Sequence, residues 1–313
     1  TTYTSILILS NTENSTFNKI DVKDVDGWKA RNSSSVVYEI LDAEKISSEP
    51  WVFVPPELTK AYRKILNIST KLEDIVGENN IINGIQTSAN DIFIIEPEDE
   101  DEEFVYFKKN NDKYKIEKGI TKPYFRTPKN DDIPVITHKT LIANSKVIFP
   151  YRRIEGKMSL IPIEELKKSF QHAYSYLLAN KEALDKRSIS PKPKSKNEWY
   201  RYGRHQCLEM DSIERKIVVG INSNRPKYPI DTSNTIYSSG GTAGYCSIHL
   251  SDKSKYSIYY IQAILNSCYL EMIVNLTGEE FKGGYVSRGT KLLPTLPIRT
   301  IDFGNKSDKE FHE

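Results

Sequence analysis

Alternation of apolar and polar residues predicts strands in the first part of the chain. Residues 3–9 form a short apolar run, residues 17–22 alternate between apolar and polar, and residues 36–40 form another strand-like run. Short apolar runs and a period of two are typical of β-strands, and the polar stretch 11–15 predicts a turn. We therefore expect residues 17–22 to form a hairpin with residues 3–9, with a further strand at 36–40.

Helical spacing marks three other segments. Over residues 56–66 apolar residues recur at steps of three and four, with proline in the first turn. The same spacing over residues 163–186, with glutamates first and basic residues last, predicts a long amphipathic helix whose charges suit its dipole. A second C-terminal helix is expected at residues 258–272, and the polar pair at 266–267 is a candidate break.

The remaining pattern is β-rich. Residues 84–95 predict a glycine-led polar turn that runs into a strand, and residues 104–116 predict a hairpin. Between them, seven of the eight residues 96–103 are acidic. They would repel a phosphate backbone, which predicts a solvated hairpin tip facing away from any nucleic acid, and an ordinary charged loop is the favoured alternative. Further strands are expected at residues 146–151, 216–219 and 246–250. The predicted fold class is α+β, with mixed β-sheets, a long amphipathic helix and a second C-terminal helix.

Composition indicates a folded chain that works in a reducing compartment. The 313 residues include 44 basic and 42 acidic side chains and 11% aromatics, which argues against disorder. Three cysteines without a C-x-x-C pair imply neither a disulfide framework nor a four-cysteine zinc site, so a cytoplasmic location is expected. No apolar run approaches the ~18 residues of a membrane helix, so no membrane partner is expected. The chain starts without methionine, directly before an apolar run, and we expect a fragment of a longer parent.

The segment 199–206 concentrates side chains that suit nucleic-acid recognition. Arginine binds phosphate or guanine with two parallel bonds, glutamine does the same to adenine, and aromatic rings stack on bases. The candidates are Trp199, Arg201, Tyr202, Arg204 and Gln206, preceded by Lys192, Lys194 and Lys196. The alternative is that the aromatic residues belong to the core and that the two arginines form a solvated rim.

The glycine-rich loop at residues 238–245 is a weaker candidate. It matches neither G-x-G-x-x-G nor the P-loop pattern, which argues against a dinucleotide or nucleoside triphosphate site. Its backbone amides and the hydroxyls of Ser238, Ser239 and Thr242 can still contact phosphates, and the alternative is an ordinary tight turn.

Metal chemistry has only faint signals. Glu214 and Lys216 form the E-x-K pattern of many metal-dependent nucleases, but the same pattern recurs at residues 165–167 on a predicted helix, where chance explains it. Four residues invite a zinc site: His205, Cys207, Cys246 and His249. On a strand the last two would point to opposite faces, so core packing is favoured over a metal.

Several stretches, taken in order, resemble the C-terminal target-recognition region of bacterial N6-adenine DNA methyltransferases, of the type II restriction-modification kind with fused methylase and specificity parts. They are residues 84–93, 122–126, 148–151, 173–178, 199–206, 240–245, 265–267 and 296–298. The opening strand resembles the end of that family's methylase domain. The resemblance implies terminal methylase strands at residues 1–55, a linker helix at 56–75 and a target-recognition domain at 76–313.

The resemblance also implies a role. The family's Asn/Asp-Pro-Pro-aromatic motif is absent, since residues 54–57 lack both the amide and the aromatic ring, and the S-adenosylmethionine loop is missing. The chain would then read double-stranded DNA without methylating it, beside the methylase domain of the same parent, which would hold the S-adenosylmethionine. The lysines would bind phosphates, and Arg201, Arg204 and Gln206 would reach base edges. Further contacts would come from Gln86, Thr87, Asn90, Ser238, Ser239, Gly240, Gly241, Thr242, Lys282 and Arg288.

Two other classes stay open. A metal-dependent nuclease would need Glu214 and Lys216 beside another carboxylate and a divalent ion. A carbohydrate- or protein-binding module would explain the aromatic residues without the lysines, and its binding would be insensitive to salt.

Overall fold

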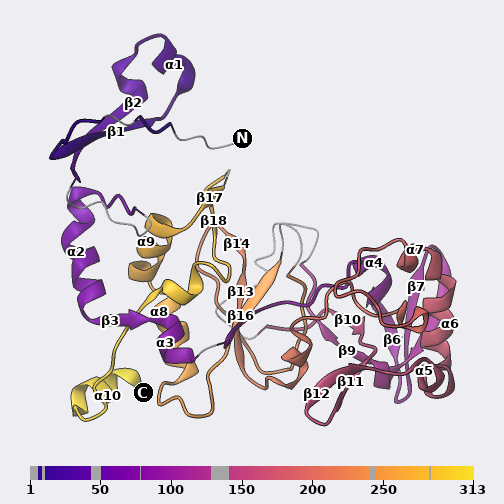
Figure 1. The fold of residues 1–313 in the computed structure, drawn as a ribbon. Coiled ribbons are helices and arrows are strands. Elements are labelled where there is room, and N and C mark those ends of the chain that lie inside the picture. The colour runs from indigo at the N-terminus through magenta and orange to yellow at the C-terminus, as the bar shows by residue number, and fades with distance from the viewer. Residues whose placement is uncertain are drawn as a thin grey trace. The chain divides into compact units, whose positions relative to one another are not determined.

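The computed structural model describes residues 6–8, 11–43, 51–77, 79–127, 141–239, 244–281 and 283–313. The chain divides into two compact units, Thr1–Pro56 and Glu57–Glu313. Helices and several small antiparallel sheets make up the fold, which confirms the α+β class (Figure 1). No helix in the described ranges is long and apolar enough to cross a membrane.

The first unit is a two-stranded antiparallel ribbon. Strand β1 (Thr16–Val22) pairs with β2 (Val36–Asp42), and helix α1 (Val25–Lys29) lies between them in sequence. The strands at 17–22 and 36–40 are confirmed, but the predicted partner was wrong. The Asp24 side chain caps α1 by accepting from Asp26 N and Gly27 N, and this turn returns the chain onto β1. Residues 6–8 carry no regular secondary structure, and the rest of the predicted first strand lies outside the described residues.

In the second unit, a strand near the beginning pairs with a strand near the C-terminus. Helix α2 (Pro56–Asn67) is confirmed, and strand β3 (Ser69–Lys71) after it pairs with β19 (Pro297–Arg299) near the C-terminus. Helix α3 (Leu72–Val76) then leads to strand β4 (Ile81–Asn83). The last element is α10 (Lys306–His312).

A four-stranded antiparallel sheet separates two apolar cores. Its order is β15-β13-β16-β4, where β13 is Lys216–Gly220, β15 is Ile230–Asp231 and β16 is Tyr245–Ile248. Because side chains alternate along a strand, Val218 packs into one core while Ile217 and Val219 pack into the other. The central strand at 216–219 is therefore confirmed, and both of its faces are buried.

The first core is formed by several small sheets and by the helices of residues 163–185. The acidic run forms β6 (Pro97–Glu100) and an exposed turn, and a three-stranded sheet continues through β7 (Phe104–Lys109) and β8 (Asp112–Glu117). The predicted 104–116 hairpin is confirmed. The other elements here are α4 (Asn90–Phe93), β5 (Ile94–Ile95), β9 (Thr121–Tyr124), β10 (Ser145–Ile148), β11 (Tyr151–Ile154) and β12 (Lys157–Leu160). The expected strand at 146–151 is split at residues 149–150 between β10 and β11.

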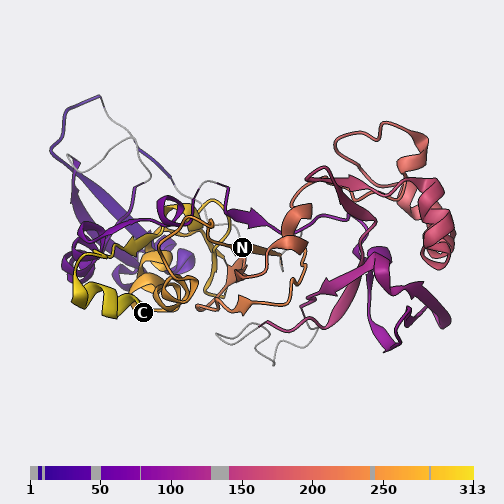
Figure 2. The same cartoon turned by 90° about the horizontal axis from the view of Figure 1, so that it is seen from below.

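The predicted long helix is three short ones: α5 (Ile163–Ser169), α6 (Gln171–Ala179) and α7 (Lys181–Asp185). The helical dihedral angles fail at Phe170, with φ −135° and ψ 58°. The Glu117 carboxylate accepts from His172 N and Ala173 N at 2.8 and 3.0 Å, so it supplies a new helix start from outside the helix. Helix α6 packs on the β6–β8 sheet, where the rings of Tyr176 and Phe107 meet edge to face (Figures 1 and 2).

The second core holds two C-terminal helices. Helices α8 (Ile258–Leu265) and α9 (Cys268–Thr277) meet at the predicted break, where the Ser267 side chain caps α9 by accepting from Leu270 N. Strand β14 (Asn222–Ser223), β17 (Glu280–Phe281) and β18 (Tyr285–Ser287) form a small three-stranded sheet with the spatial order β14-β18-β17.

Candidate nucleic-acid interface

Backbone hydrogen bonds hold the segment 199–206 against residues 84–90. Gly203 N donates to Thr87 O and Arg204 N donates to Gln86 O, both at 3.0 Å, and Ser190 N donates to Gly203 O at 2.8 Å. A Cβ atom on Gly203 would lie 1.9 Å from Ser88 Oγ, so this close approach requires glycine. The chain between residues 190 and 204 is thus a loop closed at its base.

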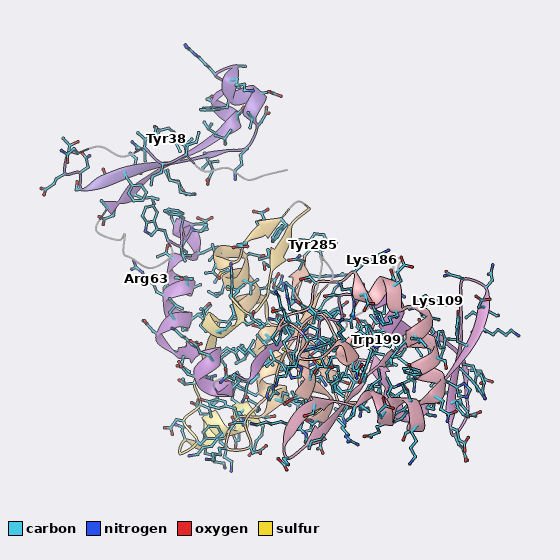
Figure 3. The ribbon with its side chains drawn as sticks, turned by 45° about the vertical axis from the view of Figure 1, so that its right-hand side comes forward. Tyr38, Arg63, Lys109, Lys186, Trp199 and Tyr285 are labelled. Atoms are coloured by element: carbon cyan, nitrogen blue, oxygen red, sulfur yellow. The ribbon has the colours of Figure 1, made fainter. Side chains whose placement is uncertain are left out.

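The aromatic residues of this segment are core residues. Tyr202 has no exposed surface, and its hydroxyl donates to Ile148 O at 2.6 Å, while its backbone N donates to the Tyr151 hydroxyl at 2.6 Å. Trp199, which is labelled in Figure 3, is 7% exposed. Its ring packs edge to face on that of Tyr200. Their rings are therefore not available for stacking on a base, and the expected DNA contact of Trp199 and Tyr202 is corrected.

Two arginines hold the base of the loop from inside. The Arg187 guanidinium donates to the carbonyls of Thr87, Trp199 and Arg201 at 2.8, 2.9 and 3.1 Å, and burial lowers its pKa to about 10. Arg201 is 8% exposed and forms an ion pair with Glu198 at 3.2 Å. The burial of Arg201 and its ion pair with Glu198 disfavour the expected contact with base edges. Arg187 was missed from sequence because a basic residue at a helix end is ordinary.

The outer side of the same loop carries exposed cations. Lys192, Lys194, Lys196 and Arg204 are all exposed, and Gln206 is half-buried. Within the described part of the chain, no carboxylate lies at ion-pair distance from any of these four cations. The loop therefore presents positive charge without internal neutralisation, as a surface for an anion requires.

Hydrogen bonds join several of the second set of candidates across the sequence. Gln86 Nε2 donates to Ser239 Oγ at 3.2 Å, and Thr87 Oγ1 donates to Asn90 Oδ1 at 2.6 Å. The hydroxyls of Tyr124 and Ser238 lie 2.7 Å apart. Three stretches distant in sequence thus meet beside the 199–206 segment. Four other candidates lie outside the described residues: Gly240, Gly241, Thr242 and Lys282.

The close approach of residues 84–86 to residues 237–239 depends on Gly84. A Cβ atom there would lie 2.4 Å from Tyr237 O, so only glycine lets residues 84–86 run beside residues 237–239. Ile85 N donates to Tyr237 O at 2.9 Å and Ser239 N donates back to Ile85 O at 3.2 Å. Thr87 and Ser238 are buried, so within this cluster Gln86, Asn90 and Ser239 keep the more accessible polar groups.

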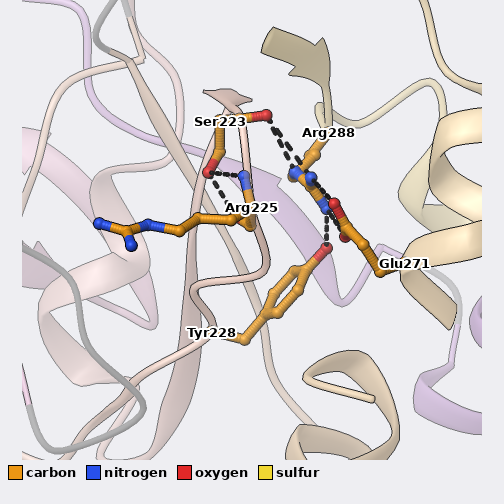
Figure 4. Close-up of polar contacts among 5 residues, drawn as sticks. All are labelled: Ser223, Arg225, Tyr228, Glu271 and Arg288. Atoms are coloured by element: carbon orange, nitrogen blue, oxygen red, sulfur yellow. Dashed lines mark hydrogen bonds and ion pairs between the residues drawn. The ribbon is translucent and has the colours of Figure 1, made fainter. Parts of the chain in front are cut away.

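Arg288 is a structural residue, contrary to the expected DNA contact. It is 1% exposed, and its guanidinium binds both carboxylate oxygens of Glu271 at 2.5 and 2.6 Å and the Tyr228 hydroxyl at 3.2 Å (Figure 4). The Glu271 bonds raise the Arg288 pKa against the opposing effect of burial. Arg225 in the same view points away from this network and is exposed. Sequence reasoning missed Arg225.

Lys216 does not have the surroundings of a nuclease lysine. Its ammonium lies 2.7 Å from Asp231 Oδ2, and both side chains are fully buried. Asp231 also accepts from Thr235 N and Thr235 Oγ1 at 2.9 and 3.0 Å, whereas Glu214 is exposed. In the described ranges no group of three or more His, Cys, Asp or Glu side chains is placed to hold a metal ion. The E-x-K pattern therefore reflects a buried ion pair at the start of β13.

The ordered stretches named above resemble the C-terminal region of fused restriction-modification enzymes. The comparison with known proteins confirms this resemblance: over 315 aligned residues, the whole chain is 40% identical to the C-terminal part of the type II restriction enzyme and methyltransferase RM.Eco57I of Escherichia coli. The match covers 100% of this chain and 32% of that enzyme, so the chain spans about a third of the length of this relative. No family model matches the chain.

Proposed function

We propose that this chain binds duplex DNA and reads a target sequence for a restriction-modification enzyme. The observation that carries the proposal is the loop at residues 190–204, which is fixed at its base and presents unneutralised cations outward. Similarity to a restriction enzyme fused to a methyltransferase supports the same conclusion. Phosphate contacts supply affinity and register, and base-edge contacts supply specificity.

The residues divide by accessibility. Lys192, Lys194 and Lys196 bind phosphates, since their ammonium groups are exposed point charges on a loop. Arg204 and Gln206 are the candidates for base edges, because arginine pairs with guanine and glutamine with adenine. Gln86, Asn90 and Ser239 line the neighbouring surface and add polar contacts.

In the parent enzyme, a methyltransferase part would bind S-adenosylmethionine and transfer the methyl group to adenine. Residues 1–55 would then be its terminal strands, residues 56–75 a linker helix and residues 76–313 the target-recognition domain. The chain's own contribution is to hold the duplex in register for that reaction.

The first test is binding to a random-sequence duplex by fluorescence anisotropy. Replacing Lys192, Lys194, Lys196 and Arg204 with alanine should weaken binding by at least about tenfold at low salt. The matched control replaces four lysines that have carboxylate partners within a helical turn: Lys167, Lys186, Lys306 and Lys309. The control changes net charge by the same amount, so equal weakening in both variants would contradict a localised site.

Sequence reading is tested by selection from a random duplex pool. The wild-type chain should enrich a defined motif, and Arg204→Ala with Gln206→Ala should lose preference at specific positions while still binding. Enrichment of no motif by a chain that binds DNA would leave a non-specific binder. Salt-insensitive binding to a carbohydrate or protein, with none to DNA, would instead favour the interaction-module alternative.

A further inference from the structure

The hairpin of β17 and β18 projects two aromatic side chains. Phe281 and Tyr285 are directly opposite each other in the strand register, and they are 44% and 42% exposed. The next pair along is Glu280 with Val286, and Val286 is buried in the second core. Because side chains alternate across a strand, Phe281 and Tyr285 share the face that points away from that core. Tyr285 is labelled in Figure 3.

Two glycines between the strands of this hairpin have a left-handed backbone conformation. Gly283 and Gly284 have φ values of 86° and 72°, in the left-handed region that favours glycine. A side chain at either position would be strained by the backbone conformation. The two glycines therefore leave the aromatic pair as the bulkiest described feature of the tip.

The base of the hairpin is anchored by strand pairing and an ion pair, whereas the two aromatic rings are exposed. Strand β18 pairs with β14 through Val286 with Ser223 and Ser287 with Asn222. Arg288, the next residue, is fixed to Glu271 of helix α9 by the two-bond ion pair (Figure 4). In contrast, neither Phe281 nor Tyr285 packs against another ring in the part of the chain that the structure describes. Exposed aromatic rings on an anchored support are typical of a contact surface.

Two basic residues, Arg225 and Lys227, follow strand β14, which belongs to the same small sheet as the hairpin. The Arg225 carbonyl accepts from Ser223 Oγ at 2.6 Å, which turns the chain directly after the strand, and the Arg225 guanidinium is exposed. Burial lowers the pKa of Lys227, and the neighbouring charge of Arg225 lowers it further. No described carboxylate forms an ion pair with Arg225 or Lys227, so an incoming anion would relieve their mutual repulsion.

We propose that the β17–β18 hairpin is a wedge that enters duplex DNA and stacks Phe281 and Tyr285 on bases at a destabilised base step, with Arg225 and Lys227 on the flanking phosphates. The inference rests on the proposed DNA-binding function and adds a site that phosphate-binding lysines do not supply. Apolar side chains inserted between bases unstack and kink a duplex, and aromatic stacking is tolerant of base identity. Exposed Glu280 does not oppose this contact, because it lies on the face opposite the aromatic pair.

The test uses the full chain and a random-sequence duplex in which 5-iodouracil replaces thymine. An aromatic side chain stacked on iodouracil cross-links to it under long-wavelength light, and mass spectrometry of the peptides locates the link. Cross-links should fall within residues 281–288. Phe281→Ala with Tyr285→Ala should remove them and weaken binding by about tenfold, with an unchanged salt dependence because no charge is altered.

Two further variants complete the experiment. Tyr269→Ala is the matched control, since Tyr269 on α9 is 67% exposed and lies outside the hairpin; it should leave both readouts unchanged. Phe281→Thr with Tyr285→Thr keeps strand propensity but removes both the rings and the apolar bulk, so it decides the matter if the alanine variant does not fold.

The outcomes separate the two proposals. A bound complex without cross-links in the hairpin, or with unchanged affinity in a folded hairpin variant, would overturn the wedge and leave DNA binding standing. A wild-type chain that does not bind the duplex would overturn both.

Discussion

Arg201 and Arg204 lie three residues apart in one segment and have opposite surroundings. Arg201 is 8% exposed and paired with Glu198, whereas Arg204 is exposed and has no such partner among the described residues. The same contrast separates Arg288, held by Glu271, from Arg225, which points away. In both pairs one arginine is buried against an internal carboxylate, and the other is exposed, as the proposed DNA contact requires. Residue type alone does not distinguish a binding arginine from a structural one; the internal partner does.

The largest expected effect on stability comes from replacing Arg288, the buried arginine of the second pair. Arg288→Met should lower the free energy of unfolding by about 3–5 kcal/mol, because Glu271 would be left as a poorly solvated charge without its partner. Urea unfolding measures the change. Arg225→Met is the exposed counterpart, and its effect should stay within about 0.5 kcal/mol. Equal effects of the two would contradict the division between support and surface.

Alkaline pH should destabilise the aromatic support. Burial raises the pKa of Tyr151, Tyr202 and Tyr237 above their ordinary value. These groups stay neutral in the folded chain but ionise in the unfolded chain, so their stabilisation is complete below pH about 10 and is lost as pH rises further. Each such tyrosine contributes a slope of about 1.4 kcal/mol per pH unit. Urea unfolding between pH 8 and 11 should show the decline, and a flat profile would mean that these hydroxyls are hydrated.

Removing one buried hydroxyl should destabilise the aromatic core around Tyr202 by a smaller amount. Tyr202→Phe removes the 2.6 Å bond to Ile148 O and leaves that carbonyl short of a donor, at a cost of about 1–2 kcal/mol. It should also reduce the alkaline slope by the share of one tyrosine. Tyr269→Phe, on an exposed side chain, is the control that should change neither quantity.

The smallest effect on stability is expected at Arg204. Arg204→Ala should change the free energy of unfolding by less than about 0.5 kcal/mol, yet weaken binding to the selected target sequence by about 1–3 kcal/mol, because the guanidinium is the candidate for a base edge. Arg201→Ala should do the reverse, weakening the fold without changing the affinity for DNA. Thermal unfolding and anisotropy titrations on both variants sharpen the comparison, and a reversed pattern would reject it.

The sequence predicted local elements where the pattern is local. The 104–116 hairpin follows from its alternating apolar and polar residues, and β13 follows from an apolar run. The break before α9 follows from the polar pair at 266–267. The single helix over 163–186 failed because its interruption at Phe170 depends on Glu117, which is distant in sequence. The expected partner of β1 was wrong because β1 pairs with β2, which follows it in the chain, and the alternation of residues 17–22 does not reveal on which side in sequence the partner lies.

The candidate site was predicted in composition but not in orientation. Sequence placed the polar residues of 86–90, 199–206 and 238–239 together, and the structure brings them side by side through Gly84 and Gly203. Which arginines are internal follows from tertiary partners such as Glu198 and Glu271, and no local pattern reveals those. The outward direction of Phe281 follows from the pairing of β17 with β18 together with the burial of Val286. Neither fact can be predicted from the sequence alone.

The central claim is that the lysines of the closed loop bind the DNA backbone, and the salt dependence of binding tests it most directly. The logarithm of the binding constant for a random-sequence duplex would be measured against the logarithm of salt concentration, for the wild type and for Lys192, Lys194 and Lys196 replaced with alanine. The account predicts that the slope falls in magnitude by about 2–3, close to one unit for each lost phosphate contact. An unchanged slope in a variant that still binds would contradict it.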